Sequence, residues 1–204
     1  MSLSRTGIIL AGGQSSRMGQ NKALMMIDGV RVIDRITNEL EKITDELLIV
    51  TNTFQTYEYL NIPMVEDEEK GKGPLAGIQA GLKASRSEEN LIVACDMPFI
   101  SSSLGDFLLE ELEDYQAAIP KLEGRMHPLF GAYRKDALQA VSQSLERNEL
   151  RIMSLLQKLK VRYISEDILR REGIHVEDTA VFNMNDQIEY EKAKKLDRDG
   201  ASFL

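Results

Sequence analysis

A strand that ends at two glycines is the most chemically informative feature of this sequence. Residues 7–11 are apolar and rich in β-branched side chains, which predicts a short buried strand. Gly12 and Gly13 follow it at once. Because glycine tolerates positive φ angles and has no Cβ, a phosphate can approach the exposed N–H groups of such a bend closely. The pattern predicts an anion-binding turn at the carboxyl end of the first strand.

Two cationic side chains follow the glycines. Arg17 offers a planar set of donors and Lys22 a mobile point charge, and both are usual partners of phosphate oxygens. The segment lacks the Gly-Lys-Ser/Thr of a Walker A loop, and its glycine spacing does not fit a dinucleotide fingerprint. We therefore expect a triphosphate cradle of another type. The alternative is an ordinary glycine turn beside two solvated cations.

Asp96 is a second candidate, at the end of another apolar run. Residues 91–95 predict a buried strand, and Asp96 follows them directly. Open α/β sheets bind ligands at the carboxyl ends of their strands, so Asp96 and Gly12 are expected at the same edge. A carboxylate beside phosphates is a natural ligand for Mg²⁺, which prefers oxygen donors. The alternative is that Asp96 caps the turn at Met97-Pro98.

Three further segments carry weaker signals. Gly73 and Gly77 flank the first turn of a predicted helix whose positive dipole end could face an anion, although a well-packed helix start would look the same. Asn52 follows a predicted strand, where asparagine in a turn is also common. Asn183 and Asn185 lie two residues apart, which places both on one side of an extended segment. Capping of the last helix by Asn185 or its neighbour is the alternative.

The elements that must position these residues alternate between strand and helix through the first half of the chain. Apolar runs predict strands and three- and four-residue apolar spacings predict helices. In order, they are a strand at 7–11, a helix at 30–43, a strand at 47–50, a helix at 74–84 and a strand at 91–95. The alternation indicates an α/β three-layer sandwich with a mostly parallel, twisted sheet covered on both faces.

The second half of the chain is less regular. Its predicted strands lie at 117–120 and 161–164, and its predicted helices at 104–112, 137–145, 152–159 and 186–196. The sequence has no internal repeat and no obvious linker. We expect a single domain over residues 1–204, in which the second half adds an edge that closes over the pocket.

The bulk composition limits the partners. With 25 Lys and Arg against 33 Asp and Glu, the formal net charge is −8, which argues against a nucleic-acid or membrane-surface binder. The sequence contains no run of about 18 apolar residues, which a membrane span would need. Its first residues also lack the apolar region of a signal peptide. The single cysteine, Cys95, is best interpreted as a small buried apolar residue in a reducing compartment. We expect a cytoplasmic protein.

Five motifs resemble a known family. They are LAGG at 10–13, RMGQNK at 17–22, GPLAG at 73–77, ACDMPF at 94–99 and NMN at 183–185. In this order they resemble the nucleotidyltransferases with a GT-A-like fold, and among them most closely the molybdenum cofactor guanylyltransferases, which join GMP to molybdopterin. The resemblance extends from Leu10 to about Asn185. It departs from the family pattern after the last motif, where Asp186-Gln187 replaces the usual Thr-Pro.

The resemblance implies a nucleotide-diphospho-sugar transferase-like fold and roles for individual residues. A nucleotide-binding half at about 6–100 would precede an acceptor-binding half at about 101–204. The implied catalytic residues are Arg17, Lys22 and Asp96, and Asp96 is the implied Mg²⁺ ligand. An asparagine of the NMN segment completes the metal site in related enzymes, and in the guanylyltransferases the pair also lies near molybdopterin. The implied nucleotide- and cofactor-binding residues are Leu10, Ala11, Gly12, Gly13, Lys22, Asn52, Asp67, Gly77, Asp96, Asn183 and Asn185.

Asp67 has a physical rationale as a base-reading residue. Guanine presents two adjacent N–H donors that one carboxylate can accept together, whereas cytosine offers only its amine. A site that leaves a buried polar group unpaired discriminates by up to about 10⁴-fold. The alternative is that Asp67 holds the ribose hydroxyls.

The implied reaction is the transfer of GMP from GTP to molybdopterin, with release of pyrophosphate and with Mg²⁺ as cofactor. The implied partners are GTP and molybdopterin or molybdenum cofactor, with molybdenum-inserting and molybdoenzyme-maturation proteins as further candidates. A cytidylyltransferase, a sugar-phosphate nucleotidyltransferase and a catalytically silent nucleotide-binding module are the alternatives. A metal-dependent glycosyltransferase would carry a D-x-D motif, which Asp96-Met97-Pro98 does not provide.

Overall fold

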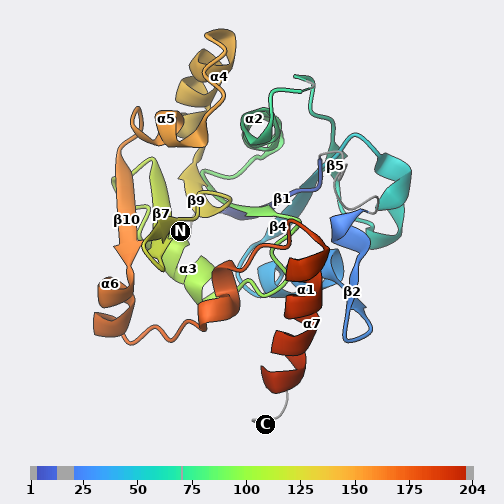
Figure 1. Cartoon of the computed structure of the whole chain (residues 1–204). Helices are drawn as coiled ribbons and strands as arrows, with labels where there is room; N and C mark the ends of the chain where they lie inside the picture. The colour runs from blue at the N-terminus through green and yellow to red at the C-terminus, as the bar shows by residue number, and fades with distance from the viewer. Residues whose placement is uncertain (1–3, 13–20, 70, 201–204) are drawn as a thin grey trace.

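The computed structural model describes residues 4–12, 21–69 and 71–200 of the chain. Within these ranges a long sheet is flanked by helices on both faces (Figure 1). The strand order is β10-β7-β9-β6-β1-β4-β5, and β8 pairs with β7. The strands of this sheet are β1 (Arg5–Leu10), β4 (Glu46–Val50), β5 (Met64–Val65), β6 (Glu89–Ala94), β7 (Ala117–Leu122), β8 (Arg125–Met126), β9 (Phe130–Arg134) and β10 (Val161–Ser165).

The sheet is mixed but mostly parallel. β1 lies in the interior and pairs in parallel with β4 on one side and β6 on the other, and β5 extends this parallel part beyond β4. β9 is antiparallel to both β6 and β7, so β7 again runs in the direction of β1, and β10 pairs in parallel with β7. The carboxyl ends of β5, β4, β1, β6, β7 and β10 therefore meet at one edge, as the predicted fold class requires.

Helices cover the two faces of the sheet in separate groups (Figure 1). One group is α2 (Pro74–Ala84), α4 (Leu138–Glu146) and α5 (Ile152–Leu156), and the other is α1 (Val32–Leu40), α3 (Ser102–Glu110) and α7 (Gln187–Gly200). Alternate residues of β1 pack into different apolar clusters: Ile8 and Leu10 join the cluster of α2, whereas Ile9 joins that of α1. The structure thus confirms the predicted three-layer α/β sandwich.

Several predicted boundaries were wrong in detail. Residues 22–27, for which no element was predicted, form a 3-10 turn, η1 (Lys22–Leu24), followed by β2 (Met26–Ile27). The helix predicted from residue 30 begins two residues later because β3 (Val30–Arg31) pairs with β2 in a hairpin. Residues 54–60 form two short 3-10 turns, η2 (Phe54–Thr56) and η3 (Glu58–Leu60). β9 was not predicted, and α6 (Glu166–Arg171), η4 (Lys135–Ala137) and η5 (Asp178–Val181) complete the described elements.

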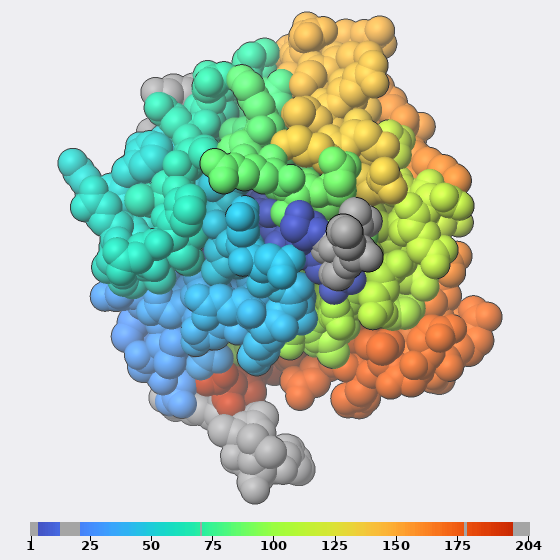
Figure 2. Space-filling view, turned by 180° about the vertical axis from the view of Figure 1, so that it is seen from behind, coloured from blue at the N-terminus to red at the C-terminus, as the bar shows by residue number. Residues whose placement is uncertain are grey.

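The opposite edge of the sheet is shown from behind in Figure 2. There the start of β1, in dark blue, reaches the surface between the turn that follows α1 and the segment that leads into β6. Arg5 is held at this edge by Asp45, Glu89 and Asp106. The carboxyl ends of the parallel strands consequently face the other side of the molecule. None of the helices in the described ranges has the length and apolar character that crossing a bilayer demands.

Candidate active site

Four predicted site residues occupy equivalent places at the ends of four neighbouring parallel strands. Each lies two residues beyond the last paired residue of β1, β4, β5 or β6, and these last residues pair with one another across the sheet. The four positions therefore form a row along the carboxyl edge. In sheet order they are Asp96 after β6, Gly12 after β1, Asn52 after β4 and Asp67 after β5.

Backbone hydrogen bonds continue beyond the strands and hold this row in place. The Ala11 N–H donates to the Val50 carbonyl at 2.9 Å, and the Cys95 N–H donates to the Leu10 carbonyl at 3.2 Å. Gly12 and Asp96 are thus each attached directly to a residue that is still bonded to the sheet. Gly13 and Arg17, the other predicted members of the cradle, lie outside the described residues.

Lys22, Asp96 and Asn185 converge although they are far apart in the sequence. The Lys22 ammonium lies 3.4 Å from Oδ2 of Asp96 and 3.5 Å from Oδ1 of Asn185. Lys22 begins η1, Asp96 follows β6, and Asn185 precedes α7. The Met184 N–H donates to the Asp96 carbonyl at 2.9 Å, which fastens the segment before α7 to the end of β6. The structure therefore brings together a predicted cation, a predicted carboxylate and a predicted amide.

The Asp96 carboxyl is only 21% exposed, and the Lys22 side chain 17%. Burial raises the pKa of Asp96 above its ordinary value. The Lys22 ammonium lowers this pKa in part, and the nearby Glu189 carboxylate raises it further, so the pKa stays above the ordinary value. A carboxylate that has lost much of its water is stabilised by a cation placed against it. Perturbed acids of this kind often mark functional sites.

The oxygen atoms that meet here fit a hard divalent cation. The Asp96 carboxylate and the Asn185 amide oxygen both face one cationic group, the Lys22 ammonium. Across the ranges that the structure describes, no three His, Cys, Asp or Glu side chains cluster to form a closed metal site. Mg²⁺ commonly takes one or two protein oxygens and completes its shell with water and substrate phosphates. Asp96 and Asn185 are therefore a suitable protein share of such a site.

The two asparagines of the NMN segment have different partners. The Asn183 amide donates to the Val181 carbonyl at 3.0 Å, whereas Asn185 faces Lys22. The Asn185 N–H donates to the Glu189 carboxylate, and the Asp186 carboxylate accepts the Glu189 N–H at 2.9 Å. Asp186 thus caps α7, as the capping alternative predicted.

Asn52 and Asp67 form a local structure at the other end of the row. The Asn52 amide oxygen accepts the Asp67 N–H at 3.1 Å and so joins the ends of β4 and β5. Oδ1 of Asp67 accepts the Glu69 N–H at 2.9 Å, which orients the half-buried carboxylate. Such a carboxylate still has lone pairs for a ligand.

Gly77 has a clear packing role. It lies buried in α2, where an added Cβ would come within 3.3 Å of Cδ2 of Leu10. Leu10 and Ala11 are themselves largely buried, so they can offer a ligand mainly their backbone. Cys95 packs against the core, and burial raises its thiol pKa to about 12, in agreement with an apolar role.

Three residues beside this cluster were not predicted from the sequence. Glu189 stands three residues after the cap residue Asp186, and this Asp-x-x-Glu spacing is a capping-box signal that could have identified it. The other two are Asn21, the residue directly before Lys22, and the buried Tyr57, which is hydrogen-bonded to Asn21. No local pattern indicates that contact, because it joins distant parts of the chain.

Comparison with known proteins gives concordant results. The family model described as the MobA-like NTP transferase domain matches residues 7–163 of this sequence. A probable molybdenum cofactor guanylyltransferase of Carboxydothermus hydrogenoformans is 38% identical over 191 residues, which cover 94% of this chain and 95% of that protein. The molybdenum cofactor guanylyltransferase of Desulfosudis oleivorans is 34% identical over 197 residues, which cover 96% of each chain.

Solved structures share the fold. Molybdopterin-guanine dinucleotide biosynthesis protein A from Archaeoglobus fulgidus superposes with a TM-score of 0.77 at 24% identity, covering 95% of this chain and 99% of that one. A CMP-2-keto-3-deoxy-manno-octonic acid synthetase complexed with CTP has a TM-score of 0.76 at 15% identity, with coverage of 97% and 99%. The same sandwich therefore occurs in chains of low sequence identity.

Proposed function

The chain belongs to the MobA-like NTP transferase family, and on that basis we propose that it transfers GMP from GTP to molybdopterin and releases pyrophosphate. The product is the molybdopterin guanine dinucleotide cofactor. The observation that carries this proposal is the convergence of Lys22, Asp96 and Asn185 at the carboxyl edge of the sheet, beside Gly12. The relatives named molybdenum cofactor guanylyltransferase, which match along nearly their whole length, support the choice of substrates.

The triphosphate is proposed to lie across the end of β1. Gly12 and Gly13 would offer backbone N–H groups, and Arg17 and Lys22 would neutralise the phosphate charge. The ammonium of Lys22 is already held at the carboxyl edge by Asp96 and Asn185, so it needs little reorganisation to meet an anion. The guanosine end would extend along the row of strand ends toward Asn52 and Asp67, where the Asp67 carboxylate is proposed to read guanine.

The reaction is a displacement at phosphorus. An oxygen of the acceptor's terminal phosphate forms a bond to the α-phosphorus of GTP. The bond between that phosphorus and the α–β bridging oxygen breaks, and pyrophosphate leaves with the electron pair. The nucleophile is already ionised at neutral pH, so no general base is required. Positioning and charge neutralisation must supply the rate acceleration.

Lys22 and Asp96 have complementary roles in this scheme. Lys22 stabilises negative charge on the departing pyrophosphate, and Asp96 keeps the ammonium at the edge until the triphosphate arrives. A divalent cation, which we propose to be Mg²⁺, would be held by Asp96 and Asn185 and would supply Lewis-acid polarisation of phosphate oxygens. In the two-part organisation that we propose, residues up to about 100 bind the nucleotide, and residues from about 101 bind the acceptor.

The test is pyrophosphate release by the full chain with Mg²⁺ and molybdopterin, in parallel reactions with GTP, CTP and ATP. Each nucleotide is also offered a sugar 1-phosphate as an alternative acceptor. The proposal requires release that depends on both GTP and molybdopterin. Release with CTP and molybdopterin, or with a sugar phosphate alone, would assign a different nucleotidyltransferase activity. Tight GTP binding with no release under any condition would indicate a silent nucleotide-binding module.

A further inference from the structure

Helix α7 is attached to the segment that carries Lys22 at a second point, away from the candidate site. In Figure 1 the helix, in red, lies beside β2, in blue. The Tyr190 hydroxyl donates to the Met26 carbonyl at 2.7 Å. Tyr190 lies five residues after Asn185, and Met26 lies four residues after Lys22. The two segments therefore meet twice, at the contact between Lys22 and Asn185 and at this hydroxyl bond.

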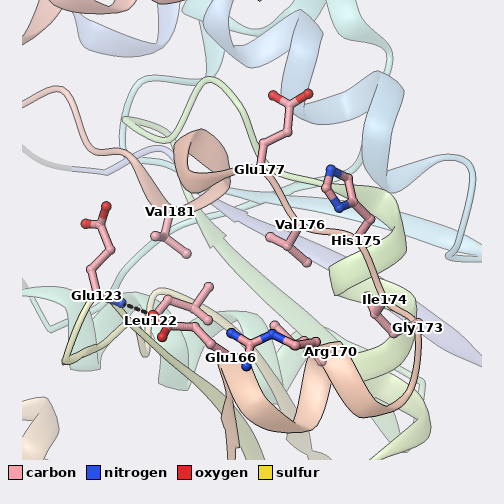
Figure 3. Close-up of a pocket in the computed structure, with 11 residues that line it drawn as sticks. Leu122, Glu123, Glu166, Arg170, Gly173, Ile174, His175, Val176, Glu177 and Val181 are labelled. Carbon is pink, nitrogen blue, oxygen red and sulfur yellow. Dashed lines mark hydrogen bonds between the residues drawn. The ribbon is translucent and has the colours of Figure 1, made fainter.

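The stretch of chain before Asn185 has an open cavity on one side. Figure 3 shows Val181 at the wall of this cavity, whose volume is about 540 Å³. The Met184 N–H donates to the Asp96 carbonyl and so holds the backbone just before Asn185. The Asn185 N–H itself donates to the Glu189 carboxylate, which belongs to α7. The position of the Asn185 side chain therefore depends on where the first turn of α7 lies.

The far end of α7 has an anchor of its own. Arg35 of α1 forms a paired contact with Asp197, at 2.7 Å from Nη1 to Oδ1 and 2.9 Å from Nη2 to Oδ2. Nη2 of Arg35 also donates to the Ile27 carbonyl at 2.9 Å. Tyr190, Ala193 and Asp197 are three and four residues apart, so they share one face of the helix, and Ala193 is fully buried there. Paired arginine–carboxylate contacts are strong, so this end stays docked without help from Tyr190.

The ring and the hydroxyl of Tyr190 have separable effects. The ring packs against the apolar cluster on the α1 face of the sheet, and phenylalanine would keep that packing. The hydroxyl alone connects the first turn of α7 to β2. Because Lys22 and Asn185 are each within five residues of this bond, its loss should change their separation while the rest of the helix remains in place.

We propose that Tyr190 is a positioning residue for the divalent-cation site, an inference that rests on the proposed function. Its bond to the Met26 carbonyl places the first turn of α7, and this turn places the amide oxygen of Asn185 relative to the Asp96 carboxylate. Tyr190 thus acts through Asn185 and not by contact with the cation. Removal of a group that orients a metal ligand commonly costs about 10- to 100-fold in metal affinity or activity.

The test uses Tyr190→Phe in the full-length protein. Tyr59→Phe is the matched control, because the Tyr59 hydroxyl also donates a hydrogen bond, to Asp34 of α1 at 2.9 Å, but does not contact α7 through it. Mn²⁺ binding to the protein with GTP is measured by water-proton relaxation, with Mn²⁺ and GTP alone as the reference. Pyrophosphate release with GTP and molybdopterin then gives the Mg²⁺ concentration for half-maximal rate. Both measurements are repeated for Asn185→Ala and for the double variant of Tyr190 and Asn185.

We expect Tyr190→Phe to weaken Mn²⁺ binding about tenfold and to raise the required Mg²⁺ concentration by a similar factor. Tyr59→Phe should change both by less than about twofold. In the Asn185→Ala background, Tyr190→Phe should add less than about twofold, because residues in one chain of contacts do not act additively.

Four results would overturn the inference. They are wild-type Mn²⁺ affinity in Tyr190→Phe, a full further loss on top of Asn185→Ala, a wild-type protein that binds no Mn²⁺ in the presence of GTP, and failure of Tyr190→Phe to fold, since the Arg35–Asp197 contact should keep α7 docked. Mn²⁺ binding that needs the Tyr190 hydroxyl, without pyrophosphate release from GTP and molybdopterin, would support the inference and refute the proposed function.

Discussion

The buried phenol of Tyr57 holds the amide of Asn21, the residue directly before Lys22. The Tyr57 hydroxyl lies 2.9 Å from Nδ2 and 3.3 Å from Oδ1 of Asn21. The same Oδ1 accepts the Ala23 N–H at 3.0 Å and so caps η1, from which the Lys22 side chain extends. Tyr57 is fully buried, and burial raises its pKa to about 12, so the hydroxyl stays protonated at neutral pH. The Tyr57–Asn21 contact therefore fixes the start of η1, from which the Lys22 side chain extends.

Tyr57→Phe should reduce catalysis without abolishing folding. The substitution keeps the buried ring but removes the bond to Asn21, and displacement of a positioning group by about 1 Å can cost up to about 10²-fold in rate. We expect kcat with GTP to fall about tenfold or more, with a smaller change in KM. Tyr133→Phe is the matched control, since Tyr133 is also fully buried and donates to the Pro128 carbonyl at 2.7 Å. A kcat for Tyr57→Phe equal to that of this control would show that the contact only stabilises the fold.

Asp67→Ala should lower the preference for GTP over CTP. If the carboxylate accepts the paired N–H donors of guanine, its loss removes an interaction that can discriminate by up to about 10⁴-fold. The measurement is the ratio of kcat/KM for the two nucleotides. Glu68→Ala is the control, because Glu68 is an exposed acid of the same loop that pairs with Lys83 at 3.3 Å. A ratio that is the same in both variants would exclude base reading by Asp67.

Glu189→Ala should weaken activity through Asn185. The Glu189 carboxylate holds the Asn185 N–H, and the Asn185 amide oxygen faces Lys22. Glutamine also serves at this capping position, so Glu189→Gln should retain most of the wild-type kcat if positioning is the role of Glu189. The comparison is kcat as a function of Mg²⁺ concentration for both variants. Equal losses in Glu189→Ala and Glu189→Gln would instead show that the negative charge itself is required.

Gly81→Ala should destabilise the contact between α2 and β1. An added Cβ would come within 2.6 Å of Cγ2 of Ile8, a stiff, fully buried side chain. Overpacking costs about 1–3 kcal/mol, whereas replacing glycine by alanine in a helix gains about 1 kcal/mol. We expect a net loss of about 1 kcal/mol in the free energy of unfolding, measured by urea denaturation. Gly77→Ala meets Leu10 at 3.3 Å and should cost less, so a larger loss there would contradict this packing argument.

The parallel half of the fold could be predicted because each of its main strands is an uninterrupted apolar run that ends in a glycine or a polar residue. The antiparallel strand β9 could not be predicted in this way. Its sequence, Phe130–Arg134, gives no sign of its pairing with β6 and β7, which depends on residues far along the chain. Helix α6 has only six residues, too few for a clear apolar period.

The candidate site was predictable to the extent that its residues follow strand ends. Gly12, Asn52, Asp67 and Asp96 each follow a strand, and parallel pairing alone places them in one row. Contacts that depend on tertiary packing were not predictable. Tyr57 reaches Asn21 from a separate segment, and the different partners of Asn183 and Asn185 follow from the way α7 begins.

The measurement that tests the account most directly is pyrophosphate release by Asp96→Asn and Lys22→Ala in the presence of GTP, Mg²⁺ and molybdopterin. Asp96→Asn keeps the size of the side chain but removes the charge that faces Lys22, and circular dichroism confirms that each variant is folded. We expect each substitution to reduce kcat by about 10²-fold or more, because preorganised charge supplies much of the rate acceleration. Wild-type turnover in either folded variant would contradict the proposed site.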